Sequence, residues 1–371
     1  MSDLIKDYSI GKLGFGFMRL PKKDGEFDKA LIDAMVDKFL ESGFTYFDTA
    51  YVYEGSEVAM RESLVKRHPR ENYTIASKLN SFTVTSSDEL IERFETTLER
   101  LGTDYVDFYL LHGMNGNSAK KYEALGSWEF LAEQKAKGRI RHIGFSYHGT
   151  ASDLAEILTK HPETEFVQLQ INYLDWESPK VDSRGVYETA RRFNVPVVIM
   201  EPIKGGALAS DDSAIAPMLK DANPDVSVAS WALRFAASLD GVLVALSGMG
   251  SLEQMVDNVK TASSLTPMND EELALLKKAV EVINAIPRIP CTGCEYCVKG
   301  CPSSIKIPNL MNTYSNYLVY NTTANVGHAY NMHTRGAGKA SDCVGCKACE
   351  QICPQGIEIT DILGKLAELF D

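Results

Sequence analysis

The sequence predicts an α/β fold in which a (β/α)8 TIM barrel over residues 1–286 is followed by a small, mainly helical domain over residues 287–371. Three observations support this division. Eight apolar, β-rich segments alternate with amphipathic segments over roughly 250 residues, and eight strand–helix units make a TIM barrel. All eight cysteines of the chain follow residue 290. Pro287 and Pro290 separate the last amphipathic segment from the first cysteine and are expected to end a helix there.

The expected strands are nearly continuous runs of apolar and β-branched residues, as in a parallel sheet covered on both faces. A doubly wound open sheet is the alternative, but it normally shows a Gly-x-Gly-x-x-Gly turn after its first strand. Here Gly14-Phe-Gly16 continues as Phe-Met-Arg-Leu-Pro, which is a different pattern. The barrel is therefore favoured, with strands near Leu13–Met18, Thr45–Thr49, Tyr73–Lys78, Val106–His112, His142–Ser146, Phe166–Ile171, Val197–Glu201 and Val242–Ser247.

The segments between these strands show helical spacing of apolar residues. Gly43, Gly102 and Gly138 fall where helix C-caps are expected. A last barrel helix is predicted at Asp270–Ala285, where Asn269 precedes Glu272 in the pattern of a capping box. The other amphipathic segments that we expect to be helical include Asp28–Glu41, Asp88–Leu101, Ala119–Lys137 and Ser183–Phe193.

The cysteines form two runs with the spacing Cys-x2-Cys-x2-Cys-x3-Cys-Pro. This spacing is typical of ferredoxins that carry two 4Fe–4S clusters, in which the fourth cysteine of each run ligates the other cluster. Two alternatives are less favoured. Structural zinc sites typically have cysteines in Cys-x2-Cys pairs, which is a different spacing, and disulfides are rare in reducing compartments. The spacing therefore predicts one cluster on Cys291, Cys294, Cys297 and Cys353, and another on Cys343, Cys346, Cys349 and Cys301.

The segment between the two runs is longer than the spacer of a minimal bacterial ferredoxin. Ile307–Tyr320 has helical spacing, Arg335–Lys339 is expected to be a loop, and a second helix is expected over Thr360–Leu369. This organisation resembles the α-helical ferredoxin domains that are fused to or assembled with larger dehydrogenases.

Composition excludes some functions. The net charge of −12 disfavours nucleic acid as a partner, because binding it needs a basic face. No apolar run approaches the ~20 residues that span a bilayer, so we expect no membrane segment. Residues Met1–Asp7 lack a charged-then-apolar secretory pattern, which predicts a cytoplasmic protein. From Pro287 onward seven basic residues balance seven acidic ones, so the acidic excess lies in the barrel.

Four reactive side chains fall at successive strand ends, where TIM barrels place their catalytic residues. They are Asp48 and Tyr53 after the second strand, Lys78 after the third and His112 after the fourth. A tyrosine has a pKa of about 10, and a nearby lysine favours its phenolate. Asp48 would hold Lys78, Tyr53 would donate a proton to a carbonyl oxygen, and His112 would orient that oxygen. Taken singly, each residue is as well explained by a salt bridge or by packing.

This set resembles the catalytic residues of the aldo-keto reductase family, and the resemblance covers about residues 8–265. Three surrounding motifs also resemble the family: Gly14-Phe-Gly16-Phe-Met-Arg, Asp48-Thr-Ala and Asp104-Tyr-Val-Asp107-Phe-Tyr-Leu-Leu-His112. The resemblance implies reduction of a small-molecule carbonyl by NAD(P)H, or oxidation of the alcohol. It also implies a nicotinamide site. The corresponding residues here are Ser146, Gln168, Asn172, Ser247, Gly248, Met249, Gly250, Ser251, Gln254 and Asn258. Lys204, in the loop after the seventh strand, is expected to contact the cofactor or substrate, with a surface pair between Lys204 and Glu201 as the equal alternative.

The chain departs from the family pattern around the cofactor. Tyr147 replaces a frequent Asn, and Met200 stands where an aromatic residue stacks on nicotinamide. The basic residues that bind the 2′-phosphate of NADP align with Gly248 or Met249 and with Gln254. NADPH, NADH and a flavin therefore all remain as cofactors. The glycine-rich Ser247–Ser251 turn opens a helix and is expected to cradle a phosphate.

A hydride carries two electrons, whereas a 4Fe–4S cluster carries one, and flavins connect the two. Three hypotheses follow. A nicotinamide-dependent reductase exchanges cluster electrons with an external ferredoxin or flavoprotein; a flavin in the barrel is fed by the clusters; or the chain is an electron carrier with a vestigial barrel site. We also expect the cluster domain to pack near the barrel mouth. Separately, the apolar and aromatic residues at the first two strand ends suggest that the substrate is an apolar or aromatic carbonyl compound; they are Phe15, Phe17, Met18 and Tyr51.

Overall fold

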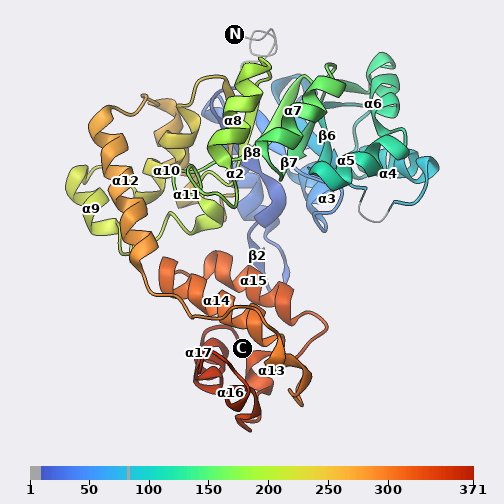
Figure 1. Cartoon of the computed structure of the whole chain (residues 1–371). Coiled ribbons are helices and arrows are strands. Elements are labelled where there is room, and N and C mark those ends of the chain that lie inside the picture. Colours follow the sequence, from blue (N-terminus) through green and yellow to red (C-terminus); the bar gives the residue numbers. More distant parts are fainter. Residues whose placement is uncertain (1–9, 82–83) are drawn as a thin grey trace. The chain divides into compact units, whose positions relative to one another are not determined.

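The structure, a computed structural model, describes residues 10–81 and 84–371, so the N-terminal residues Met1–Asp7 lie outside the described part. The chain divides into two compact units (Figure 1). The first comprises the described part of Met1–Pro202 and Ser230–Asn269. The second comprises Ile203–Ala229 and Asp270–Asp371.

The first unit is a closed barrel of eight parallel strands in the order β1-β10-β9-β8-β7-β6-β5-β4. Phe15 of β1 pairs with Phe47 of β4 on one side and with Ser247 of β10 on the other, which closes the barrel. This arrangement confirms the predicted (β/α)8 fold. The strands are β1 (Leu13–Gly16), β4 (Tyr46–Asp48), β5 (Thr74–Leu79), β6 (Val106–Met114), β7 (Ile140–Tyr147), β8 (Phe166–Gln170), β9 (Val197–Met200) and β10 (Val242–Ser247).

The barrel interior is filled by large apolar side chains. Tyr46, Phe108 and Phe166 are buried there, and Tyr46 and Phe166 each lie about 5 Å, ring to ring, from Phe108 (5.1 and 5.2 Å). Gly14 fits beside them because it has no side chain. A Cβ at Gly14 would lie 2.6 Å from side-chain atoms of Val244 and Leu246. The first strand therefore approaches the eighth closely, as dense interior packing requires.

Helices surround these strands (Figure 1). Asp28 caps α2 by accepting a hydrogen bond from Leu31 N, and Gly102 ends α4 with a φ of 68°. The segment Ala119–Lys137, predicted as one helical stretch, is instead two helices, because Gly126 adopts a left-handed φ of 66° between them. The helices are α2 (Lys29–Glu41), α3 (Ser56–Met60), α4 (Ser87–Leu101), α5 (Gly116–Ala124), α6 (Ser127–Ala136), α7 (Ala151–Lys160), α8 (Ser183–Arg192), α10 (Val228–Ala237) and α11 (Leu252–Ser263). A short hairpin, β2 (Lys22–Lys23) and β3 (Glu26–Phe27), precedes α2.

The second unit is helical, as predicted. Helix α14 has the predicted bounds Ile307–Tyr320, and the predicted C-terminal helix runs over Ile359–Phe370. Its core gathers Ile305, Leu310, Tyr330 and Leu366 between these helices. Helix α15 was not predicted. The helices are α9 (Ala216–Ala222), α12 (Asp270–Ala285), α13 (Tyr296–Lys299), α14 (Ile307–Tyr320), α15 (Ala324–Thr334), α16 (Ala348–Gln351) and α17 (Ile359–Phe370).

Within residues 10–81 and 84–371, no helix combines the length and the apolar character that a membrane crossing requires.

Candidate active site and cysteine pockets

The structure brings the four predicted catalytic residues together at the C-terminal rim of the barrel. Lys78 Nζ lies 2.6 Å from Asp48 Oδ1 and donates a second hydrogen bond, of 2.7 Å, to Thr49 O. The same ammonium lies 5.1 Å from the centre of the Tyr53 ring. The Tyr53 and His112 rings meet edge to face, with centres 5.8 Å apart.

Strand register explains this convergence. Asp48 pairs with Ala76, two residues before Lys78 on β5, and Lys78 pairs with Leu110, two residues before His112 on β6. Alternate residues of a strand share a face, so the reactive side chains step along adjacent strands toward one point.

Tyr53 lies in the turn between β4 and α3, and buried polar contacts hold that turn. Glu57 is 2% exposed and accepts hydrogen bonds from Ser77 Oγ at 2.8 Å and from Arg100 Nη1 at 3.3 Å. Arg100 also donates to Tyr51 O at 3.2 Å. These bonds tie the turn to strand β5 and helix α4, so the tyrosine is presented by a fixed backbone.

The charge state of Lys78 follows from its partners. Burial acts to lower the pKa of the ammonium, but Asp48 and then Tyr53 more than offset it, so the pKa is raised and Lys78 is a cation at neutral pH. Burial raises the pKa of Tyr53. Lys78 opposes this shift and Asp48 adds to it, and the net change is upward. The expected lowering by Lys78 is therefore present but outweighed, and Tyr53 carries its proton at neutral pH.

His112 is held neutral. Burial lowers its pKa to about 3, with further electrostatic contributions from the Lys78 cation and from His148. Its Nδ1 is buried and has no protein partner, and the same is true of Asp48 Oδ2. Buried polar atoms are normally hydrogen-bonded, so atoms left without a partner at a barrel rim indicate a place for a ligand.

Two of the predicted cofactor residues lie side by side on β7 and β8, where Ser146 pairs with Gln168. Ser146 Oγ accepts a hydrogen bond from Gly113 N at 2.8 Å. Gln168 is 3% exposed, and its Oε1 has no protein partner. Tyr147 points elsewhere, because its hydroxyl donates to Thr150 O at 2.8 Å.

The side chain of Asn172 forms three hydrogen bonds to neighbouring residues. Its Nδ2 donates to Asp175 Oδ2 at 2.9 Å and to Glu201 O at 3.2 Å, and its Oδ1 accepts from Asp175 N at 2.9 Å. The side chain thus ties the turn after β8 to the end of β9. Lys204 belongs to the second unit, where it begins a 3-10 helix, Lys204–Gly206, with a positive φ of 49°.

The turn after β10 is a capped helix start. Ser251 Oγ accepts from Gln254 N at 3.3 Å, and Gln254 Oε1 accepts from Gly250 N at 2.8 Å. Asn258 Nδ2 donates to Ser247 Oγ at 2.8 Å and braces the turn from α11. The Gly250 N–H that we expected to face a phosphate is therefore already bonded.

Arg19 is a residue that the sequence did not single out. A Cβ added at Gly248 would lie 4.0 Å from Arg19 Cβ, so Arg19 borders the turn after β10. Its charge also lowers the pKa of Tyr53. A basic residue bordering both the tyrosine and the glycine turn fits an anionic cofactor. The signal that could have identified Arg19 was its position as the last residue of the motif Gly14-Phe-Gly16-Phe-Met-Arg.

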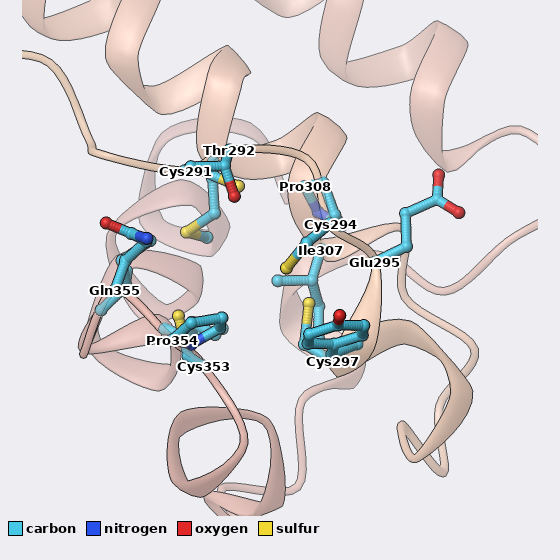
Figure 2. A pocket seen from close by; sticks show the side chains of 14 residues that line it. Cys291, Thr292, Cys294, Glu295, Cys297, Ile307, Pro308, Cys353, Pro354 and Gln355 are labelled. Atoms are coloured by element: carbon cyan, nitrogen blue, oxygen red, sulfur yellow. The ribbon is translucent and has the colours of Figure 1, made fainter.

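The eight cysteines line two pockets in the second unit. The first is walled by Cys291, Cys294, Cys297 and Cys353, and Figure 2 shows their sulfur atoms turned toward a common space. The second is walled by Cys301, Cys343, Cys346 and Cys349. Each pocket thus takes three cysteines from one run and the fourth from the other.

This spread of thiols differs from a site for one ion. Ligands of a single zinc ion converge on one point, and among the described residues no three His, Cys, Asp or Glu side chains do so. Four thiols spread around one pocket fit a polynuclear group, in which each sulfur binds a different iron.

Comparisons with known proteins identify a family for each of the two parts of the chain. Residues 12–281 match the sequence model of the Aldo/keto reductase family, and residues 290–358 match that of the 4Fe-4S dicluster domain. The NAD/NADP-dependent indole-3-acetaldehyde reductase of Schizosaccharomyces pombe is 28% identical over 217 residues, which cover 58% of this chain and 68% of that protein. Methylglyoxal reductase DkgB of Salmonella typhi is 27% identical over 230 residues, covering 61% and 79%.

The crystal structure of an aldo-keto reductase from Klebsiella pneumoniae in complex with NADPH has the same fold. It matches with a TM-score of 0.60 and 22% identity, covering 73% of this chain and 91% of that one. The second unit contains both cysteine runs and carries the 4Fe-4S dicluster domain. Since the family match spans well over half of its residues, the chain is an oxidoreductase that belongs to the aldo/keto reductase family.

Proposed function

We propose that the barrel reduces the carbonyl group of a small molecule with a hydride from NADPH or NADH, or catalyses the reverse oxidation. The observation that carries this proposal is the buried Lys78–Asp48 pair beside Tyr53 and His112. The relatives named for indole-3-acetaldehyde and methylglyoxal reduction support the reaction class. Their substrates differ, so the substrate of this chain is proposed only as a carbonyl compound.

Tyr53 is the proton donor. Its raised pKa keeps the hydroxyl protonated at neutral pH, which is the form that reduction needs. When the proton leaves, the phenolate is stabilised by the Lys78 cation, and Asp48 holds that cation in place. The neutral imidazole of His112 hydrogen-bonds the carbonyl oxygen and orients it toward Tyr53.

The nicotinamide cofactor would supply the hydride. The residues present fit it, because the buried Gln168 Oε1 lacks a partner and can accept an N–H from a carboxamide. Ser146 lies beside it on the neighbouring strand. Arg19 and the turn after β10 provide charge and close backbone approach for a phosphate. The Klebsiella pneumoniae protein binds NADPH, and the Schizosaccharomyces pombe reductase is named for both dinucleotides, so the proposal includes both.

The two pockets are proposed as the sites of two 4Fe–4S clusters, with the ligand sets expected from the spacing. Clusters held by these cysteines would supply one-electron chemistry, exchanged with an external ferredoxin or flavoprotein. Hydride chemistry and cluster chemistry then meet only through a group that handles both one and two electrons.

Two measurements test this proposal. Tyr53→Phe should lower the rate of carbonyl reduction by about 10²–10⁴-fold while the iron content stays unchanged; full activity in that variant would favour an electron carrier with an unused barrel site. An anaerobic absorption spectrum before and after adding NADPH or NADH should show unbleached clusters that dithionite still reduces. Bleaching by the nicotinamide alone, with a flavin in the purified protein, would replace the proposal with a flavin-linked reductase.

A further inference from the structure

The two cysteine runs form an internal repeat whose halves can be compared position by position. Cys291–Ile307 and Cys343–Ile359 have the same length and spacing, and each contains a four-residue helix, α13 or α16. Positive φ angles recur at matching places, 63° at Glu295 and 56° at Lys347. The backbones of the two pockets are therefore alike, and their differences lie in the side chains.

Charge is one such difference. The charged residue that lines the first pocket is Glu295, and the one that lines the second, at the matching position, is Lys347. The Lys347 side chain is 66% exposed, and its acidic neighbour Glu350 lies at 3.9 Å. Glu350 is turned inward, where its Oε1 accepts hydrogen bonds from the N–H and hydroxyl of Thr360. Lys347 thus adds a largely exposed positive charge at the second pocket, within ion-pair distance of Glu350.

Bulk is the other difference. Gly300, which lines the second pocket, matches Ile352, whose side chain is 53% exposed. A Cβ at Gly300 would meet open space, and its φ of −98° suits any residue, so neither packing nor backbone geometry requires glycine there. Two further residues that line the second pocket are exposed: Val344, at 69%, and Cys346. The surface around Gly300 is therefore partly apolar.

We propose that this surface, the second-pocket rim (Gly300, Val344, Cys346 and Lys347), is the docking site of a small acidic protein that carries one electron at a time. The proposal rests on the proposed function of the clusters as electron carriers. A partly apolar centre without a side chain at Gly300, beside the exposed Lys347, suits a small, weak electron-transfer contact that is steered by charge. In each encounter the reduced carrier loses one electron, and one oxidised 4Fe–4S cluster gains it.

The test uses reduced flavodoxin, an acidic one-electron flavoprotein, as the probe. The purified holoprotein is mixed with it anaerobically, and the bleaching of the clusters is followed by stopped flow. We expect the second-order rate to fall as salt rises, and to fall at least tenfold in Lys347→Glu at low salt. Gly300→Ile, which copies the first pocket, should slow the reaction without changing its salt dependence. Glu295→Gln is the matched control and should not slow it.

The outcomes separate docking from the proposed function. Reduction by dithionite should stay fast in every variant, because a small reductant needs no docking surface. Equal flavodoxin rates in wild type, Lys347→Glu and Gly300→Ile would overturn the docking site while leaving the clusters as carriers. A faster rate in Glu295→Gln, in which a negative charge that repels the acidic carrier is lost, would move the site to the first pocket. Clusters that no reductant can reduce would overturn the proposed function itself. If Lys347→Glu loses iron, a wild-type rate that is independent of salt still refutes the proposal.

Discussion

The ammonium of Lys78 and the carboxylate of Asp48 are 2.6 Å apart, and both side chains are almost fully buried, at 1% and 6% exposed. Removing one partner of a buried ion pair leaves an unpaired charge, which typically costs about 3–5 kcal/mol of stability. Lys78→Met should therefore lower both the free energy of unfolding and the activity. The double variant Lys78→Met/Asp48→Asn should recover most of the stability and none of the activity. Urea unfolding and carbonyl reduction assays measure the two effects, and a double variant as unstable as the single one would contradict this account.

The protonation state of Tyr53 predicts a pH profile. Because the pKa of Tyr53 is raised above its usual value of about 10, the proton donor is present throughout the neutral range. Carbonyl reduction should be flat around neutrality and decline only in strongly alkaline solution. Tyr53→Phe should lower kcat by about 10²–10⁴-fold, the range of a lost general acid. Initial rates across pH measure this, and a decline of the wild-type rate already near pH 7 would assign the proton to another group.

His112 links stability to pH. Its folded-state pKa of about 3 lies below its unfolded value near 6.5, so the unfolded chain binds an extra proton between these pH values. The folded state should therefore lose stability as pH falls below about 6.5, by about 2 kcal/mol at pH 5 from this residue alone. Chemical denaturation at pH 7 and pH 5 tests this prediction. The drop should be smaller in His112→Asn, and an equal drop in both proteins would show that other groups cause it.

The opposite charges at the two pockets predict unequal clusters. Lys347 stabilises an added electron at the second pocket, whereas Glu295 opposes one at the first. The cluster on Cys343, Cys346, Cys349 and Cys301 should accept the first electron. A redox titration followed by electron paramagnetic resonance should show two steps. Lys347→Gln should lower the potential of the first step, and Glu295→Gln should raise that of the second. The assignment would be wrong if both substitutions moved the same step.

The barrel was predictable from sequence because its strands are buried on both faces and form unbroken apolar runs. The convergence of the four predicted catalytic residues was predictable because the C-terminal ends of all barrel strands lie on the same rim. Packing and capping decided what the sequence left open. Gly126 splits the helical stretch predicted at Ala119–Lys137. Helix α15 went unpredicted because Ala324–Thr334 has few apolar residues at helical spacing. Asn172 also has a structural role that the sequence did not indicate, because it bonds Asp175 and Glu201, and its contact with a cofactor stays a prediction. The packing of the cluster domain near the barrel mouth stays a prediction.

The crossing of the cysteine runs has a consequence for how the protein is made. The first pocket needs Cys353 as well as Cys291, Cys294 and Cys297, so on the proposed ligand sets it has only three of its four thiols until residue 353 has been translated. The second pocket lacks its last thiol until Cys349 has been translated, although Cys301 leaves the ribosome much earlier. Neither group can then be fully ligated during synthesis of the barrel, and both cluster insertions become late events of biogenesis. The cell must keep the early thiols reduced and unoccupied by other metals while the rest of the chain emerges.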